Sequence, residues 1–94
     1  GLMFTIEKRL NKGSWMDLGM FLQTLMIAAR GLGLDSCAQA AFADYHVAIR
    51  GELDIPDSET LVCGMGIGYR VDDAPENLWR TDREDISAFT TWHE

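Results

Sequence analysis

The sequence predicts a mixed fold of helices and strands, and three stretches of its 94 residues carry that prediction. Residues 2–8 alternate apolar and polar-tending side chains with a period of two, which is the pattern of a short strand. An apolar stretch from residue 15 to about residue 31 has helical spacing. Residues 60–70 form a continuous apolar run with interspersed glycines, which indicates a buried strand. A chain of this length forms at most one domain.

The first predicted helix begins at Trp15 and ends near Gly31 or Gly33. Ser14 is followed three residues later by Asp17, which resembles a capping box at a helix start. Apolar side chains then occupy every face of this helix, so every face must be buried. A fragment of about two helices and two strands is too small to surround it. We therefore expect further polypeptide or another subunit to cover the helix.

A second helix is expected after a loop at residues 35–37, and it carries one amphipathic stripe. The stripe consists of Phe42, Tyr45, Ile49 and Leu53. This helix ends before Ile55-Pro56, because Pro disfavours helical geometry in the residue before it. Glycines at 64, 66 and 68 indicate that something approaches the backbone of the second strand closely. Residues 72–76 form a polar loop, and residues 86–92 show a weak apolar period of three.

Charge and cysteine content restrict the class of partner and the compartment. The formal charge of -7 opposes attraction to nucleic acid or to anionic membranes. No signal-peptide pattern opens the chain, and polar residues interrupt its most apolar region, which predicts a soluble protein without a membrane segment. Cys37 and Cys63 lack metal-ligand spacing and lie in apolar segments, so two reduced, partly buried thiols are expected. A reducing cytoplasm fits these features.

No residue pattern predicts a catalytic acid, base, nucleophile or metal site. The glycines at 64, 66 and 68 have the spacing G-x-G-x-G, whereas the dinucleotide fingerprint needs G-x-G-x-x-G and a helix directly after it. His46 and His93 have no Cys, Asp or Glu at ligand spacing, so His46 is interpreted as a surface or boundary histidine. The serines lack a nucleophile-elbow motif.

Arg80 and Arg83 admit two interpretations. A guanidinium group can bind a phosphate through two hydrogen bonds, so the pair could form an anion site. Alternatively, the two arginines pair with Asp82, Glu84 and Asp85 on a solvated surface. Spacing alone favours the surface pairing.

Six stretches of the chain, taken in order, carry a family resemblance. They are residues 13–23 (GSWMDLGMFLQ), 28–34 (AARGLGL), 35–41 (DSCAQAA), 61–69 (LVCGMGIGY), 74–77 (APEN) and 80–83 (RTDR). These stretches resemble the C-terminal half of the FMN-dependent nitroreductase family and span nearly the whole chain. The resemblance implies an α+β fold with a mainly antiparallel sheet. It also implies a homodimer with the helix from Trp15 at its core and FMN at the subunit interface.

The same resemblance implies a flavin contact at the start of the second helix. Ala38, Gln39, Ala40 and Ala41 correspond to a loop whose backbone N–H groups face the N5 edge and the si face of the flavin. A helix start offers N–H groups without intrahelical acceptors and the positive end of the helix dipole, which would stabilise a reduced flavin. Relatives usually have Pro where this chain has Ala38, and donation from the backbone survives that change.

A second implied contact lies near the end of the chain. Arg83 corresponds to the arginine that binds the FMN phosphate, with Thr81 or Arg80 as helpers, so the resemblance favours the phosphate interpretation. Many relatives continue with an acidic residue and Pro, whereas Glu84 is followed here by Asp85. The course of the tail therefore differs from the family pattern.

The resemblance implies an FMN-dependent oxidoreductase that uses NAD(P)H to reduce nitroaromatics, quinones or similar small-molecule acceptors. The flavin carries the chemistry, so no catalytic side chain is named. The family's Arg-rich N-terminal segment would precede Gly1, so residues 1–94 are interpreted as the C-terminal part of a nitroreductase-like domain. The expected partner of residues 1–94 is then a second copy of the chain or the missing N-terminal segment. The alternative is a truncated, non-enzymatic dimeric scaffold that no longer binds flavin.

Overall fold

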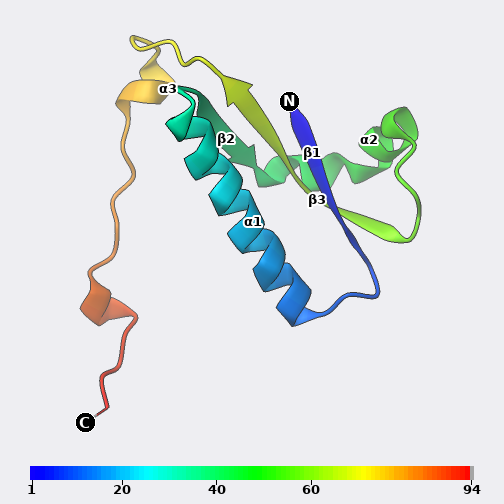
Figure 1. Cartoon of the computed structure of the whole chain (residues 1–94), viewed down its shortest axis with the longest axis horizontal. Helices are drawn as coiled ribbons and strands as arrows, with labels where there is room; N and C mark the ends of the chain where they lie inside the picture. Colours follow the sequence, from blue (N-terminus) through cyan, green and yellow to red (C-terminus); the bar gives the residue numbers. More distant parts are fainter. Residues whose placement is uncertain (94) are drawn as a thin grey trace.

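The computed structural model describes residues 1–93 and combines a three-stranded sheet with one long helix (Figure 1). The elements in chain order are β1 (Leu2–Glu7), α1 (Lys12–Gly31), β2 (Asp35–Gln39), the 3-10 helix η1 (Ala40–Tyr45), α2 (His46–Leu53), β3 (Glu59–Gly68), α3 (Pro75–Leu78) and the 3-10 helix η2 (Ile86–Ala88). The predicted α+β class is confirmed. Both strands expected from sequence are present as β1 and β3.

The sheet has the order β1-β3-β2, and β3 is antiparallel to both neighbours. β1 and β2 are consecutive strands joined by α1, yet β3 lies between them. The central strand therefore comes last in the chain, and the sheet is complete only after residue 68 has been reached. A bulge between Phe4 and Thr5 interrupts the pairing of β1 with β3.

One face of β3 packs against α1. Phe4 lies opposite Cys63 in the ladder, and its ring meets Phe21 of α1 edge-on, with centroids 6.2 Å apart and planes at 68°. Residues paired across strands share a face, so Cys63 and its alternate neighbour Met65 face α1. Leu61 lies beyond the bulge, where it pairs with Thr5 and borders a hollow lined by Ala43 and His46. Leu61, Cys63 and Met65 are buried, and with Ile6 and Ala29 they form the hydrophobic core.

Helix α1 begins three residues earlier than the sequence suggested. Asn11 is the N-cap, and the Trp15 N–H already donates to the Asn11 carbonyl at 3.2 Å. No side chain caps this end, so the predicted capping box at Ser14 is wrong. Trp15 lies almost a full turn inside the helix that it was expected to start.

The C-terminal end of α1 follows the prediction closely. The helix ends at Gly31, and Gly33 adopts the left-handed conformation with φ at +77°. The Gly33 N–H donates to the Arg30 carbonyl at 3.0 Å, and the Leu34 N–H donates to the Ala29 carbonyl at 2.9 Å. These two hydrogen bonds form the Schellman motif. Glycine adopts its left-handed backbone conformation readily, whereas other residues adopt it only with strain.

The segment after α1 differs from the prediction. Residues 35–37 were expected to form a loop, but they belong to β2, which pairs with β3 from Asp35 opposite Gly68 to Gln39 opposite Gly64. The second helix is present and ends at Leu53 as expected, although its first six residues form the 3-10 helix η1. The predicted polar loop at 72–76 contains the first two residues of α3.

Residues 69–93, which we call the C-terminal arm, leave the body of the molecule (Figure 1). The radius of gyration is 16.5 Å, whereas a compact chain of this length has about 12 Å. The accessible surface is 7832 Å², roughly 2,400 Å² more than a folded monomer of this mass exposes. This chain therefore presents surface that compact domains bury.

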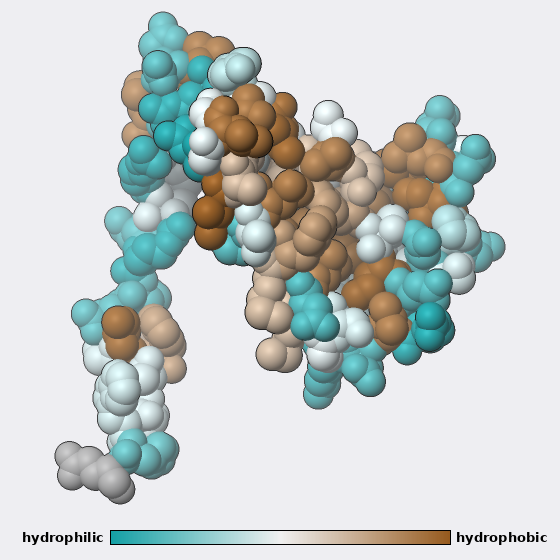
Figure 2. All heavy atoms as spheres, viewed as in Figure 1, coloured by the Kyte–Doolittle hydropathy of each residue, from teal (hydrophilic) through white to brown (hydrophobic). Residues whose placement is uncertain are grey.

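Much of that surface is apolar and lies on α1, where Figure 2 shows apolar side chains gathered along the helix. Ala29 is the single buried residue of α1. Large side chains exposed on this helix are Trp15, Met16, Met20, Phe21 and Ile27. The sheet covers one side of the helix and leaves the other open, as expected for a helix that is apolar all round.

Candidate functional site

The segment Gln39–Ala41 lies where β2 ends and η1 begins. All of its residues are exposed, as is Ala38 before them. No side chain caps the start of η1, and the first N–H groups of a helix have no acceptor within the helix. Alanine side chains at 40 and 41 leave the backbone open to close approach. The segment can therefore offer backbone N–H donors to a planar ligand.

Arg80, Thr81 and Arg83 lie on the C-terminal arm and are exposed. The Arg83 guanidinium donates to the Thr81 hydroxyl and, at 3.0 Å, to the Asp82 carbonyl. These bonds fold the side chain back on its own segment. All of these bonds come from one nitrogen, Nη1, and within residues 1–93 the other N–H groups of the guanidinium make no hydrogen bond.

The surface pairing considered for these arginines is not formed within residues 1–93. The ion pairs there join Arg9 to Glu7, Arg30 to Asp35 and Arg70 to Asp72. Asp85 instead accepts hydrogen bonds from the Ser87 hydroxyl at 2.7 Å and from the Ser87 N–H at 2.9 Å. These two bonds hold the pKa of the Asp85 carboxyl below its usual value.

The two groups of predicted flavin contacts do not come together within one chain. Gln39–Ala41 lies at the sheet, whereas residues 80–83 lie on the arm after it has left the body (Figure 1). The residues of both groups are exposed.

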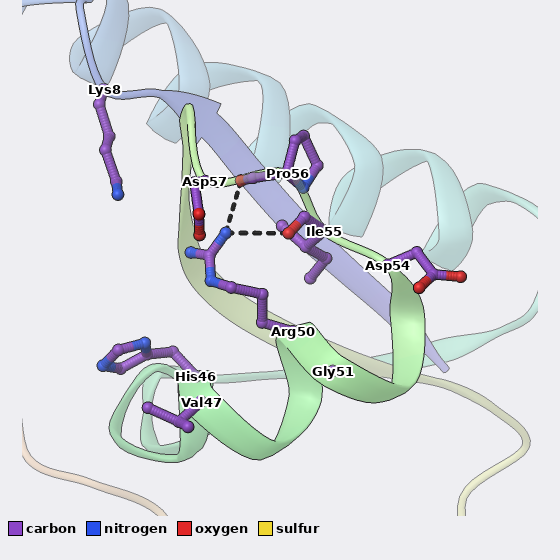
Figure 3. Close-up of a pocket in the computed structure, with 9 residues that line it drawn as sticks. All are labelled: Lys8, His46, Val47, Arg50, Gly51, Asp54, Ile55, Pro56 and Asp57. Carbon is purple, nitrogen blue, oxygen red and sulfur yellow. Dashed lines mark hydrogen bonds between the residues drawn. The ribbon is translucent and has the colours of Figure 1, made fainter.

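A hollow of about 710 Å³ lies at the other end of the fold, between α2 and the loop that leads to β3 (Figure 3). Arg50 crosses it and donates to the carbonyls of Ile55 at 3.1 Å, Pro56 at 2.5 Å and Glu59 at 2.8 Å. Its guanidinium is thus occupied in closing the loop before β3. The sequence analysis missed this role, although a basic residue in the last helical turn before an X-Pro pair is a detectable signal. His46 lines the same hollow and is exposed, as expected.

The two thiols lie in different environments. Cys63 is buried in the core, and desolvation raises the pKa of its thiol. Cys37 is exposed, so the expectation of partial burial is wrong for this residue. Cys37 pairs with Gly66 in the ladder, and both residues are exposed, so the face of the sheet that they share is open at this point. Cys37 borders an open hollow of about 360 Å³ beside the end of β3.

Residues 1–93 hold no cluster of three or more side chains suited to binding a metal ion. None of the helices in the same range combines the length and the apolar character needed to cross a bilayer.

The structure as a whole is an α+β fold with an uncovered apolar surface on α1. The sequence model of the nitroreductase family matches residues 4–69, and this chain belongs to that family. The match begins within β1, extends through β3 and ends at residue 69, the first of the C-terminal arm. The family predicted from sequence is thereby confirmed.

Curated relatives are nitroreductases from bacteria. The chain is 47% identical over 90 residues to a 4-nitrobenzoate reductase of Pseudomonas putida, which covers 96% of this chain and 40% of that protein. It is 40% identical over 95 residues to a nitrobenzene nitroreductase of Ectopseudomonas oleovorans, covering 100% of this chain and 42% of the relative. The chain thus spans about two fifths of the length of these relatives.

Solved structures show the same fold. The FMN and NADPH-dependent nitroreductase NfnB from sphigopyxis sp. strain HMH superposes with a TM-score of 0.92 at 30% identity, over 98% of this chain and 41% of that one. The FMN-dependent nitroreductase NfnB from Mycobacterium smegmatis, solved in complex with NADPH, gives a TM-score of 0.87 at 30% identity with the same coverage. The fold is therefore nitroreductase-like, and it corresponds to part of each of these chains.

Proposed function

We propose that residues 1–94 form the C-terminal part of an FMN-dependent oxidoreductase that uses NAD(P)H to reduce nitroaromatic compounds. The observation that carries this proposal is the 47% identity to a 4-nitrobenzoate reductase across almost the whole chain. The structural relatives are described as FMN and NADPH-dependent, which supports the same cofactors here. Quinones and similar acceptors belong to the proposed range, and a cytoplasmic location stays a prediction of the sequence.

In this proposal, Gln39, Ala40 and Ala41 bind the flavin ring through backbone N–H groups. The structure is compatible with that role, because the segment is exposed and two of its three side chains are single methyl groups. When bound, FMN supplies the hydride chemistry of the reaction. The residues of this chain bind and orient it, and their N–H dipoles favour negative charge on the ring.

Arg83, with Arg80 and Thr81, is proposed to bind the FMN phosphate. Its bond to the Thr81 hydroxyl restricts the guanidinium before any ligand arrives, which lowers the entropy cost of binding. The separation of the arm from Gln39–Ala41 supports a site built from more than one chain. We therefore propose a homodimer in which each flavin contacts residues of both copies, or a complex with a further N-terminal segment.

The exposed face of α1 supports this assembly. Obligate homodimers bury about 2,000 to 5,000 Å² in total, and the surplus surface of a single copy already reaches roughly 2,400 Å². We expect sedimentation at micromolar concentration to show a dimer or a larger complex. A folded monomer under those conditions contradicts the proposed assembly.

Visible absorption of the purified protein tests the function against its rival, a scaffold that binds no flavin. Bound oxidised flavin makes the protein yellow, whereas the scaffold is colourless. If purified protein is colourless and stays so after incubation with FMN, the proposed function is wrong.

Replacing Arg83 by Ala tests the phosphate contact. A charge-assisted hydrogen bond contributes about 1.5 to 3 kcal/mol, so FMN affinity should fall about ten- to a hundredfold in Arg83→Ala. Arg83→Lys should recover part of the loss, because an ammonium keeps the charge but not the planar fork. Arg9→Ala is the matched control, since Arg9 is an exposed arginine that pairs with Glu7 on the surface. Equal affinity in Arg83→Ala and wild type would show that Arg83 is a solvated charge.

A further inference from the structure

Gly64 lies in β3 at the point where another element approaches its backbone most closely. An ideal Cβ built on Gly64 would lie 2.6 Å from Cδ2 of Phe42 and 3.0 Å from both Cε2 and Cγ of the same ring. Three ring atoms within this range mean that the ring lies flat over the place of the missing side chain. Gly64 is buried and Phe42 half-buried, so the contact is sheltered from water.

This contact lies directly behind the proposed flavin segment. Gly64 is the ladder partner of Gln39, the last residue of β2. Phe42 follows Gln39 by three residues, within η1. The chain therefore leaves β2 at Gln39 and enters η1. Three residues later, the Phe42 ring lies over Gly64, which is the residue of β3 that pairs with Gln39. The residues between Gln39 and Phe42 are Ala40 and Ala41.

The ring lies on the face of β3 that α1 does not cover. Cys63 and Met65 face α1, so Gly64 between them points to the opposite side of the sheet. η1 is the element that packs there, and any residue larger than glycine at position 64 would hold it away from the sheet. The other two glycines of the run differ, because a Cβ on Gly66 or Gly68 would meet no atom within 4 Å.

We infer that Gly64 and Phe42 are positioning residues, whose contact sets where the backbone N–H groups of Gln39, Ala40 and Ala41 lie relative to the flavin. This inference rests on the proposed function, since it assigns a role at the same site. The ladder fixes one end of the segment at Gln39, and the Phe42 ring fixes the other end three residues later. Because the segment is held at Gln39 and at Phe42, the positions of the backbone N–H groups between these residues are restricted.

The test compares two alanine variants of one strand. Gly64→Ala places a methyl group against the Phe42 ring, whereas Gly66→Ala places it in open space on the same face. We expect Gly64→Ala to weaken FMN binding at least tenfold and Gly66→Ala to change it less than twofold. Both are measured by flavin titration of the apoprotein, made from the complete reading frame, after far-UV circular dichroism has confirmed the fold. Equal affinities in the two variants overturn the inference.

A second pair of measurements separates positioning from a general loss of packing. The double variant Gly64→Ala, Phe42→Leu should bind FMN more tightly than Gly64→Ala alone, because the smaller side chain makes room for the added methyl group. The midpoint potential of bound flavin should become more negative in Gly64→Ala, since displaced N–H groups stabilise the reduced ring less. Each tenfold loss in binding of reduced relative to oxidised flavin lowers a two-electron potential by about 30 mV. An unchanged potential together with no rescue overturns the inference.

The single variant Phe42→Leu provides a second test of the inference if Gly64→Ala does not fold. This variant removes the ring without adding an atom near the strand, and it should also bind FMN more weakly and with a more negative potential. Wild-type affinity and potential in Phe42→Leu contradict the inference. Failure of the proposed function is distinguishable from all of these results, because then the wild-type protein itself binds no FMN.

Discussion

The body of the molecule, residues 1–68, buries several of its apolar residues, whereas the C-terminal arm, residues 69–93, buries none of them. All five core residues lie in the body, on β1, α1 and β3. The arm has no buried residue within the described range, and Trp79 and Trp92 are 73% and 81% exposed. An apolar side chain is buried only where a framework holds a second surface against it.

The hydrogen bonds explain the difference. β3 pairs along its length with β1 and β2, which are distant in sequence, and these ladders bring α1 and η1 onto opposite faces. Within residues 1–93 the side-chain hydrogen bonds of the arm join residues at most six positions apart, such as Asn77 to the Val71 carbonyl. Local bonds shape short turns, but they do not attach a segment to the rest of the protein.

A core truncation in the body should give the largest effect. Met65 is 2% exposed, and Met→Ala substitutions at such sites cost about 2 to 5 kcal/mol. Phe89→Ala in the arm should change the free energy of unfolding by less than about 0.5 kcal/mol, because that ring is exposed. Urea denaturation of both variants measures the contrast. Similar losses at the two positions would show that the arm packs on the body in solution.

The end of α1 should give the next effect. Gly33→Ala forces a side chain into the left-handed region at φ +77°, which costs roughly 1 to 2 kcal/mol. Gly31→Ala is the matched control, since Gly31 is the last helical residue and a Cβ there meets no atom within 4 Å. The control should be neutral or stabilising by up to about 1 kcal/mol. Thermal unfolding of the pair decides, and an equal loss in both variants would contradict the Schellman end.

The two thiols should react at different rates, because Cys63 is buried in the core and Cys37 is exposed on the edge strand β2. At pH 7, iodoacetamide should label Cys37 at least about tenfold faster than Cys63, because the reactive thiolate is scarcer and less accessible at the buried site. Since burial raises the pKa of Cys63, the stability linked to it is present below the ordinary thiol pKa. It is lost as pH rises through the raised value. Mass spectrometry of the peptides measures both rates, and equal rates would show that β3 opens readily.

The smallest expected effect is confined to the arm. The Ser87 hydroxyl and N–H lower the pKa of Asp85, so the turn they form is favoured above the ordinary carboxyl pKa. That preference is lost as pH falls through the lowered value. Ser87→Ala should move the Asp85 pKa back toward its usual value, while the urea midpoint stays unchanged. NMR titration of the Asp85 carboxyl detects the shift, and an unshifted pKa in the variant would mean that the turn is not formed.

Several features of the fold and site followed from local sequence patterns. The alternation of residues 2–8 predicted β1, and the apolar run with glycines predicted β3. Gly33 indicated the end of α1. Family motifs identified the nitroreductase family, which the match over residues 4–69 confirms. The flavin contacts proposed at Gln39–Ala41 and at Arg83 stay predictions, because their roles depend on a ligand and on chains beyond this one.

Other features needed contacts between distant residues. β2 has the sequence DSCAQ, whose residue types mostly disfavour strands, and it is a strand because β3 pairs with it. Ser14 and Asp17 had the spacing of a capping box, but the helix had already begun at Lys12. The approach of Phe42 to Gly64 joins residues 22 positions apart, so the sequence indicated a close approach but not the partner.

The sequence by itself determined β1, β3, the helical character of α1 and α2, and how the polypeptide ends its long helix, because periodicity and glycine conformation act over a few residues. It also determined that α1 carries more apolar surface than this chain can cover. Only the tertiary structure decided that β3 lies between β1 and β2, that Cys37 is exposed while Cys63 is buried, and that Phe42 rests on Gly64. These outcomes depend on which strands pair, and pairing energy is shared between residues far apart in sequence.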